Sequence, residues 1–454
     1  MSQTHNKLSA SDRIYAFLDM GSVEIIYNES VVAAKGKVNG RSVYAYAQDF
    51  SKNAGAMTED MADKICQVMD MALKDMVPLI SINECAGAHI QEGVRSLAGF
   101  GRIFKKNIQA SGVIPQISAV LGPCAGGAVY SPALADFTVM VKDSSYMFIT
   151  GPGVVKAVTR EEVSKEELGG ASVHTVRSGV AHFAAENDFH ALQTIRQLLE
   201  YLPSNNIQPV SRRGTYDSVD RQDESLNDIV PENPKKPYDV YKVIGSIVDQ
   251  DSFFEVHKTW AKNMVVGFAY MGGLSVGLVA NQPKILAGVL DSDASRKAAA
   301  FVRFCDAFNI PVITLVDVPG FLCGTAQEHS GVITHGAKLL YAYGEATVPK
   351  LTVTLRKSFG GAHVTMGSKE LGADICFAWP SAQIAVMGSE SAAAVLSSQD
   401  ADNDICNPEH AVRNGSIDEI IEPATTRARL IDALVGLTAA QSAGPWKKHG
   451  CMPL

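Results

Sequence analysis

The sequence contains the same glycine turn twice, and this repeat constrains the fold more than any other feature. The two stretches read VIPQISAVLGPCAGGA at 113–128 and TVPKLTVTLRKSFGGA at 347–362. Pro115 and Gly126 are 11 residues apart, and so are Pro349 and Gly360. A chain that repeats such a spacing is expected to build one structural unit twice.

The elements around each turn follow the same order. A helical apolar pattern, a proline and a buried strand occur in KICQVMDMALKDMVPLISINE at 64–84 and in KAAAFVRFCDAFNIPVITLVD at 297–317. A second helical pattern follows in each half, at 94–112 and at 331–347. After each turn come an Ala-Asp, a strand (137–141 or 375–379) and a strand that ends in glycine (146–151 or 383–388). The halves are therefore interpreted as an internal duplication.

Short apolar strands that alternate with helices are typical of an α/β fold whose strands are largely parallel and covered on both faces. The 454 residues suit two domains rather than one. A polar, proline-spotted stretch near the middle separates the halves. We therefore expect an N-terminal domain at 1–210, a linker at 211–238 and a C-terminal domain at 239–454.

Composition excludes several classes of protein. The net charge of −8 and the lack of a basic stripe argue against nucleic acid as a partner. The polar N-terminus is unlike a secretory signal, and no apolar run reaches the roughly 18 residues of a membrane span. We expect a cytoplasmic protein without membrane insertion. The eight cysteines contain no C-x-x-C pair, so neither a metal site nor a disulfide framework is predicted.

A strand followed by Gly-Gly-Ala and a helix has a direct chemical use. The first amides of a helix have no acceptor within it and lie at the positive end of its dipole. Glycine lets a ligand approach them closely. Such a turn can stabilise an oxyanion, for example a thioester enolate. A single turn of this kind would favour tight packing of strand and helix, whereas two turns at matched positions indicate two related oxyanion sites.

Longer motifs then identify a family. The chain carries GPCAGGAVYSPALADFTVMVKDSSYMFITGPGVVKAVTREEVSKEELGGA at 122–171, SGVAHFAAEND at 178–188, FVRFCDAFNIPVITLVDVPGFL at 301–322 and HGAKLLYAYGEATVPK at 335–350. These stretches resemble the carboxyltransferase subunits of the propionyl-CoA carboxylase, methylmalonyl-CoA decarboxylase and transcarboxylase family. The resemblance covers most of the chain.

The resemblance implies two tandem crotonase-like domains and assembly as a trimer of dimers. It implies that the N-terminal domain binds acyl-CoA and the C-terminal domain binds biotin. The amides of Gly126 and Gly127 would hold the thioester oxygen, and those of Gly361 and Ala362 the ureido oxygen of biotin. Biotin N1 would take the α-proton, and the resulting enolate would accept the carboxyl group.

The resemblance also carries the remaining site residues. On the acyl-CoA side these are Ala88, His89, Gly151, Pro152 and Val364. On the biotin side they are Gly360, His363 and Thr334.

Three motifs depart from the family pattern: NECAGAHIQEG at 83–93, CGTAQEHSGVITHG at 323–336 and GGAHVTM at 360–366. His89 and Thr334 stand where the family has arginine, so each position loses a fixed positive charge. His363 replaces a tyrosine, and Val364 stands at a position that influences acyl-chain choice. The resemblance also indicates that an N-terminal helix, an early loop and a region near the C-terminus are shortened here.

The chain has no biotin-accepting M-K-M segment and no biotin carboxylase pattern. A biotin carboxyl carrier protein, together with a biotin carboxylase or membrane decarboxylase subunits, is therefore expected as partner. The favoured function is the transfer of a carboxyl group between carboxybiotin and the α-carbon of a short acyl-CoA. The acyl-CoA is of the propionyl-CoA or methylmalonyl-CoA type, and the transfer can run in either direction. Two alternatives stay open: a biotin-independent crotonase-type acyl-CoA decarboxylase, and a catalytically silent homologous subunit.

Overall fold

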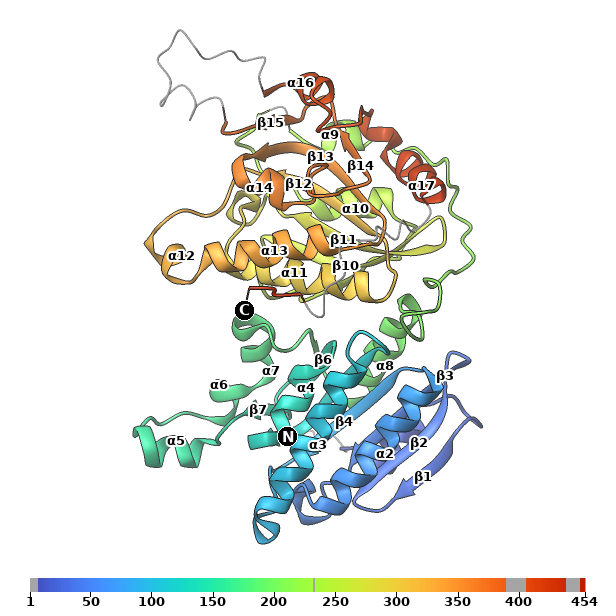
Figure 1. Cartoon of the computed structure of the whole chain (residues 1–454), viewed down its shortest axis with the longest axis vertical. Coiled ribbons are helices and arrows are strands. Elements are labelled where there is room, and N and C mark those ends of the chain that lie inside the picture. The colour runs from blue at the N-terminus through green and yellow to red at the C-terminus, as the bar shows by residue number, and fades with distance from the viewer. Residues whose placement is uncertain (1–6, 232, 389–405, 438–449, 454) are drawn as a thin grey trace, which may run out of the picture. The chain divides into compact units, whose positions relative to one another are not determined.

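Residues 7–231, 233–388, 406–437 and 450–453 are described by a computed structural model, in which the chain divides into unit 1 (1–209) and unit 2 (210–454) (Figure 1). Each unit contains an eight-stranded sheet among its described residues. Helices pack on the sheet of each unit and bury its apolar side chains.

In unit 1 the sheet has the order β1-β2-β3-β4-β5-β6-β8, with β7 beside β5. The first three strands are antiparallel, and the others are parallel to their neighbours. The strands are β1 (Glu24–Asn28), β2 (Val31–Val38), β3 (Arg41–Gln48), β4 (Leu79–Cys85), β5 (Gln116–Ala125), β6 (Phe137–Val141), β7 (Tyr146–Phe148) and β8 (Phe183–Ala185). The helices are α1 (Ala10–Phe17), α2 (Glu59–Asp75), α3 (Val94–Ala110), α4 (Tyr130–Leu134), α5 (Pro152–Thr159), α6 (Lys165–Gly169), α7 (Ala171–Val173) and α8 (Asp188–Tyr201), with short turns η1 (Asn53–Gly55), η2 (Ile90–Glu92), η3 (Gly126–Val129) and η4 (His174–Ser178).

Local sequence explains where these elements begin and end. Thr58 caps α2 by accepting from the amide of Met61, and the left-handed Met76 ends the helix just before Pro78. Every residue of β4 is buried, as expected for a parallel strand covered on both faces.

In unit 2 the sheet has the order β16-β14-β13-β12-β11-β10-β9, with β15 beside β13. The strands are β9 (Phe254–Val256), β10 (Met264–Met271), β11 (Leu274–Asn281), β12 (Val312–Val318), β13 (Lys350–Phe359), β14 (Ile375–Ala378), β15 (Gln383–Ala385) and β16 (Glu419–Ile420). The helices are α9 (Leu226–Ile229), α10 (Val240–Ile247), α11 (Ser292–Ala307), α12 (Thr325–His329), α13 (Val332–Glu345), α14 (Gly360–Thr365), α16 (Pro408–Arg413) and α17 (Thr426–Gly436), with turns η5 (Leu286–Gly288) and η7 (Pro423–Thr425).

The two sheets correspond strand for strand, including the short strand that pairs with the long central one. The helical patterns expected before Pro78 and Pro311 are α2 and α11, the buried strands expected after these prolines are β4 and β12, and the helical patterns at 94–112 and 331–347 are α3 and α13. The predicted α/β class and the internal duplication are therefore confirmed.

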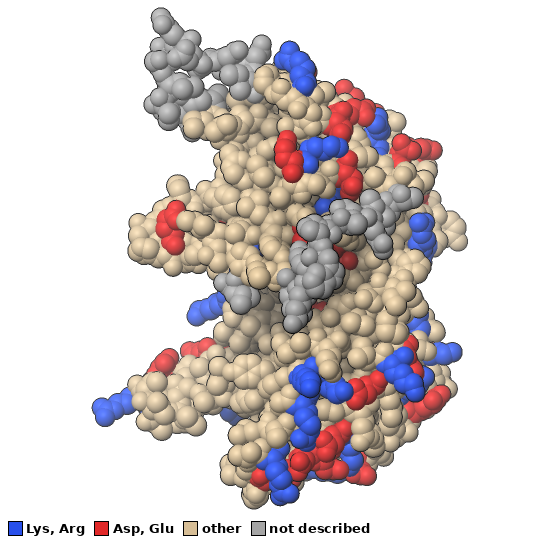
Figure 2. All heavy atoms as spheres, viewed as in Figure 1, with Lys and Arg blue, Asp and Glu red and all other residues tan. Residues whose placement is uncertain are grey.

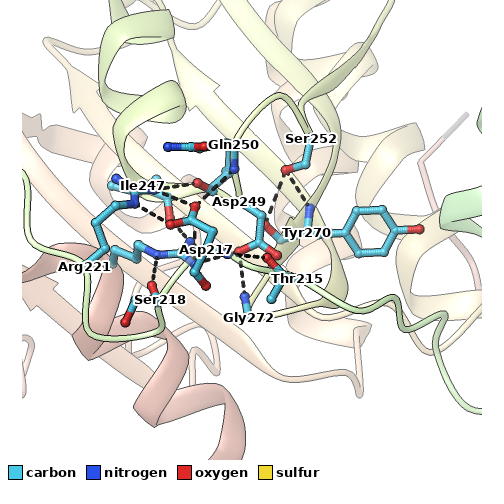
Figure 3. A network of polar contacts seen from close by, with 12 residues as sticks. Thr215, Asp217, Ser218, Arg221, Ile247, Asp249, Gln250, Ser252, Tyr270 and Gly272 are labelled. Atoms are coloured by element: carbon cyan, nitrogen blue, oxygen red, sulfur yellow. Dashed lines mark hydrogen bonds and ion pairs between the residues drawn. The ribbon is translucent and has the colours of Figure 1, made fainter.

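The segment expected to be a linker, 211–238, lies within unit 2 and is hydrogen-bonded to the rest of that unit at both of its ends. Near its start the amide of Arg213 donates to the carbonyl of Gly273, at 2.9 Å, and near its end Lys236 accepts from Arg356, also at 2.9 Å. Figure 3 shows the network that fixes the start of the segment, in which Asp217 pairs with Arg221. The polar residues from which a linker is predicted lie along this mostly exposed path.

The same network includes a buried ion pair. Arg427 of α17 lies 2.7 Å from the carboxylate of Asp249, and both side chains are about 1% exposed. Asp249 also accepts from the amides of Gly272 and Gly273 at the turn between β10 and β11 (Figure 3). This turn lies where β11 begins, so the network is at the sheet edge opposite to the carboxyl ends of β12 and β13.

On the face in Figure 2, acidic and basic side chains lie side by side over α2 and α3 of unit 1. Ion pairs join them, such as Arg102 with Asp63 at 2.9 Å and Lys106 with Asp70 at 2.5 Å. Within the described ranges, no helix has the length and apolar character needed to span a membrane.

Candidate active site

The two glycine turns have the same backbone conformation. The last residues of β5 and β13, Ala125 and Phe359, are extended. The next residues, Gly126 and Gly360, have φ of +62° and +59°. Only glycine adopts this left-handed region readily, which explains why a glycine follows each strand. We call Gly126–Ala128 the first turn and Gly360–Ala362 the second turn.

Each turn starts a helical segment, η3 in unit 1 and α14 in unit 2. By helix geometry, their first amides have no acceptor within the segment and point toward whatever lies beyond the strand end. The superposable residues are Gly126 with Gly360 and Gly127 with Gly361, since both follow the strand in the same order. The expected donor pairs, Gly126–Gly127 and Gly361–Ala362, are thus displaced by one residue relative to each other.

A short strand lies beside each turn and supports it. β7 pairs with the end of β5, with Phe148 opposite Ala125, and β15 pairs in the same way with β13. In unit 1 this strand leads to Gly151 and to Pro152, which begins α5. The structure therefore brings these two predicted residues to the strand adjacent to the first turn.

The loop after β4 is held in place by backbone hydrogen bonds. The amide of Met57 donates to Gly87 at 2.8 Å, and the amide of His89 donates to Met57 at 3.0 Å. In unit 2, Leu290 donates to Gly320 at 3.0 Å and Leu322 donates to Leu290 at 2.7 Å. The half-buried Ala88 lies in the loop after β4. It therefore lies near the carboxyl end of β4, the strand that pairs with β5.

Sequence reasoning missed a buried carboxylate below each loop. Glu84 is 2% exposed. Its carboxylate accepts a hydrogen bond from Arg13 of α1 at 2.8 Å and another from Lys7. Asp317 is 1% exposed and accepts from Arg356 of β13 at 3.0 Å. Burial raises the pKa of Asp317, and Arg356 opposes that effect. A signal existed, because each carboxylate lies near the end of a strand that is rich in apolar residues, but the spacing of the sequence could not reveal its partner.

His89 and Cys85 do not form a nucleophile and base. The thiol of Cys85 donates to the carbonyl of Gly87 at 3.4 Å, and burial raises its pKa. The Nδ1 atom of His89 is buried and has no hydrogen-bond partner among the residues that the structure describes. Because only the thiolate is a strong nucleophile, this arrangement does not favour covalent chemistry at Cys85.

Next to the second turn, His363 forms a hydrogen bond between its Nδ1 and the Oγ of Ser358, at 2.8 Å. Burial lowers the pKa of His363, while the charge of Glu370 raises it. The neutral imidazole is therefore favoured at pH 7. Val364, the next residue of α14, is 38% exposed, and Thr334 is an exposed residue in the first turn of α13.

Within the described ranges, no three His, Cys, Asp or Glu side chains gather in a way that could hold a metal ion. The two turns themselves present backbone amides at the ends of β5 and β13. Such a site can orient a carbonyl-type ligand and stabilise negative charge on its oxygen.

Comparisons with known proteins agree with this geometry. A family model described as the carboxyl transferase domain matches residues 10–452. The carboxyltransferase subunit of propionyl-CoA carboxylase from Haloferax mediterranei is 50% identical, with 99% of this chain and 94% of the relative covered. The alpha subunit of methylmalonyl-CoA decarboxylase from Veillonella parvula is 51% identical over 94% of this chain and 86% of the relative. The crystal structure of transcarboxylase 12S, a hexamer with hydrolysed methylmalonyl-CoA bound, superposes with a TM-score of 0.95 at 44% identity, covering 99% of this chain and 93% of that one.

Proposed function

Because this chain belongs to the carboxyl transferase family, we propose that it moves a carboxyl group between carboxybiotin and the α-carbon of a short acyl-CoA. The observation that carries the proposal is the pair of glycine turns at corresponding positions of two equivalent sheets. One turn serves each of the two carbonyl-type oxygens that the reaction requires. Propionyl-CoA and methylmalonyl-CoA are the substrate types favoured by the names of the relatives.

At the first turn, the amides of Gly126 and Gly127 hold the thioester oxygen. Negative charge grows on this oxygen when the α-carbon loses its proton, and donors that are already oriented stabilise the charge without reorganisation. The positive end of the helical segment that begins at Gly126 adds to the effect. These residues therefore lower the barrier to enolate formation.

Four more residues belong to this acyl-CoA side: Ala88, His89, Gly151 and Pro152. Their support is positional, because the loop after β4 and the end of β7 both lie beside the end of β5. We assign Val364 to acyl-chain selection. A methyl group more or less in such a wall changes selectivity by about 1–3 kcal/mol.

Biotin, when bound, supplies the carboxyl group and the base that takes the α-proton. The second turn fits its ureido oxygen, because Gly361 is exposed and a side-chain carbon built there would have no neighbour closer than 3.9 Å. The amides of Gly361 and Ala362 hold this oxygen, with Gly360 shaping the turn. His363 and Thr334 border the same site.

We also propose the partners. The biotin arrives on a carboxyl carrier protein, and a biotin carboxylase or membrane decarboxylase subunits complete the reaction. Transcarboxylase 12S assembles as a hexamer, and we propose a homo-oligomer of the same kind, a trimer of dimers, for this chain. A location in the cytoplasm stays a prediction.

The test is decarboxylation of methylmalonyl-CoA and malonyl-CoA by the purified full-length chain, with and without free biotin. We expect product only when biotin is present. Equal product without biotin would contradict the proposal and favour a biotin-independent decarboxylase. No product under either condition, while methylmalonyl-CoA fails to bind, would favour a silent subunit.

A further inference from the structure

The two turns differ in the origin of the aromatic ring that packs beside them. In unit 1 the ring belongs to Phe100 of α3, which is 4% exposed. A side-chain carbon built on Gly127 would lie 3.0 Å from Cδ2 of this ring. Ala88, in the loop after β4, carries only a methyl group.

In unit 2 the ring comes from the loop instead. Phe321 pairs with Leu290 in the same parallel bridge that joins Ala88 to Met57, so Phe321 and Ala88 occupy equivalent positions. The ring points toward α13 at Gly336, where an added carbon would lie 3.0 Å from Cε1 and Cζ. It also reaches the second turn, 3.9 Å from a carbon built on Gly361.

The different origin of the ring in the two units changes which side chains line the space beside each turn. Phe100 is buried under the first turn, whereas Phe321 is only half-buried and its ring forms part of the wall beside Gly361. At the first turn the equivalent loop residue is Ala88, whose half-buried side chain is a methyl group. The loop therefore carries a methyl group in unit 1 and an aromatic ring in unit 2.

We propose that the pair Ala88 and Phe321 decides which ligand each glycine turn accepts. The inference rests on the proposed function. A flexible thioester chain needs the space that Ala88 leaves, and a phenyl group there would fill it. The compact fused ring of biotin gains contact area from the exposed part of the Phe321 ring.

Reciprocal substitutions test this assignment in the full-length chain. We expect Ala88→Phe to weaken propionyl-CoA binding by at least about tenfold, as measured by calorimetry. We expect Phe321→Ala to raise the KM for free biotin by about tenfold in methylmalonyl-CoA decarboxylation, while the Kd of propionyl-CoA changes less than about twofold. A purely structural role would shift both ligand constants together.

Two further variants control for packing. Phe321→Leu keeps most of the side-chain volume and should raise the KM for biotin less than Phe321→Ala does. Phe100→Leu removes the buried ring and should lower the melting temperature without a selective change in the KM for biotin. If Phe321→Ala does not fold, Ala88→Phe and Phe321→Leu decide the question.

The outcomes separate this inference from the proposed function. Unchanged propionyl-CoA binding in Ala88→Phe, or an unchanged KM for biotin in Phe321→Ala, would overturn the inference while the wild-type activity stands. A wild-type chain that neither binds propionyl-CoA nor responds to biotin would overturn the proposed function, and the inference with it.

Discussion

Unit 1 and unit 2 share one topology, but different side chains make the corresponding hydrogen bonds. Near the start of β6, the amide of Thr138 donates to Nδ1 of His182 at 3.1 Å. At the corresponding point of β14, the amide of Cys376 donates to the carboxylate of Asp418 at 2.7 Å. The hydrogen bond to the strand is retained, and the chemical nature of its acceptor is free to change.

Other positions are retained more closely. Asp136 accepts from the amide of Gln116 at the start of β5, and Asp374 accepts from Lys350 at the start of β13, both at 2.7 Å. The repeated Ala-Asp of the sequence thus caps the long strand in each unit. Buried backbone groups require hydrogen-bond partners. Both units therefore keep a hydrogen bond at each of these strand ends, whereas the side chains beside the two glycine turns differ.

The buried carboxylates give the largest expected difference between the units. We predict that Arg356→Met lowers the free energy of unfolding of unit 2 by about 3–5 kcal/mol, because Asp317 is left charged and unpaired. Arg13→Met should cost unit 1 less, since Glu84 keeps its contact with Lys7 and the second carboxylate partner of Arg13, Asp188, is partly exposed. Urea unfolding followed by hydrogen exchange at 312–318 and 79–85 measures the two effects separately.

A surface pair supplies the control for this experiment. Arg303 and Glu345 also form an ion pair, but the Arg303 side chain is 46% exposed. Arg303→Met should change stability by less than about 1 kcal/mol. If Arg356→Met cost no more than Arg303→Met, the buried pair would not hold the loop after β12.

The exchanged acceptor predicts an acid sensitivity at β6 that the corresponding hydrogen bond at β14 does not share over the same pH range. Burial lowers the pKa of His182 to about 3, and its Nδ1 accepts a hydrogen bond only when it carries no proton. As pH falls below the unfolded pKa of about 6.5, the unfolded chain binds a proton that the folded chain does not. Unit 1 should lose about 2 kcal/mol of stability between pH 6.5 and pH 5 from this group.

Hydrogen exchange at 137–141, measured across this pH range, follows the loss. His182→Gln keeps a hydrogen-bond acceptor that does not titrate, so its exchange should depend less on pH. An equal acid sensitivity in wild type and His182→Gln would assign the effect to other groups.

His363 gives a smaller and local effect. We predict that His363→Tyr leaves the melting temperature within a few degrees, because only the hydrogen bond to Ser358, worth about 1 kcal/mol, is lost. Biotin-dependent turnover or acyl selectivity should shift, by up to about tenfold. Comparison with Ser358→Ala separates loss of the hydrogen bond from the change of side chain, and unaltered kinetics in both variants would mark His363 as neutral.

Much of this architecture could be predicted from the sequence. Repeated spacing located both glycine turns and the helices before them, because regular periods and glycine requirements are local properties of the chain. The buried pairs of Glu84 with Arg13 and Asp317 with Arg356 could not be predicted, since each joins residues far apart in the sequence. The exchange between Phe100 and Phe321 was missed for the same reason, because it depends on which element fills a space in three dimensions.

Propionyl-CoA binding by Gly126→Ala and Gly361→Ala, alongside biotin-dependent decarboxylation of methylmalonyl-CoA, tests most directly whether the two turns serve two ligands. Gly21→Ala is the control for a left-handed backbone in open space, and Gly245→Ala is the control for an added methyl group on the exposed face of a helix, α10. We predict that Gly126→Ala loses propionyl-CoA binding, whereas Gly361→Ala binds it normally but loses turnover by about 10²-fold, because the added methyl group displaces the ligand oxygen from the amides. Full biotin-dependent turnover in Gly361→Ala, or equal loss of propionyl-CoA binding in both variants, would contradict the assignment of one turn to each ligand.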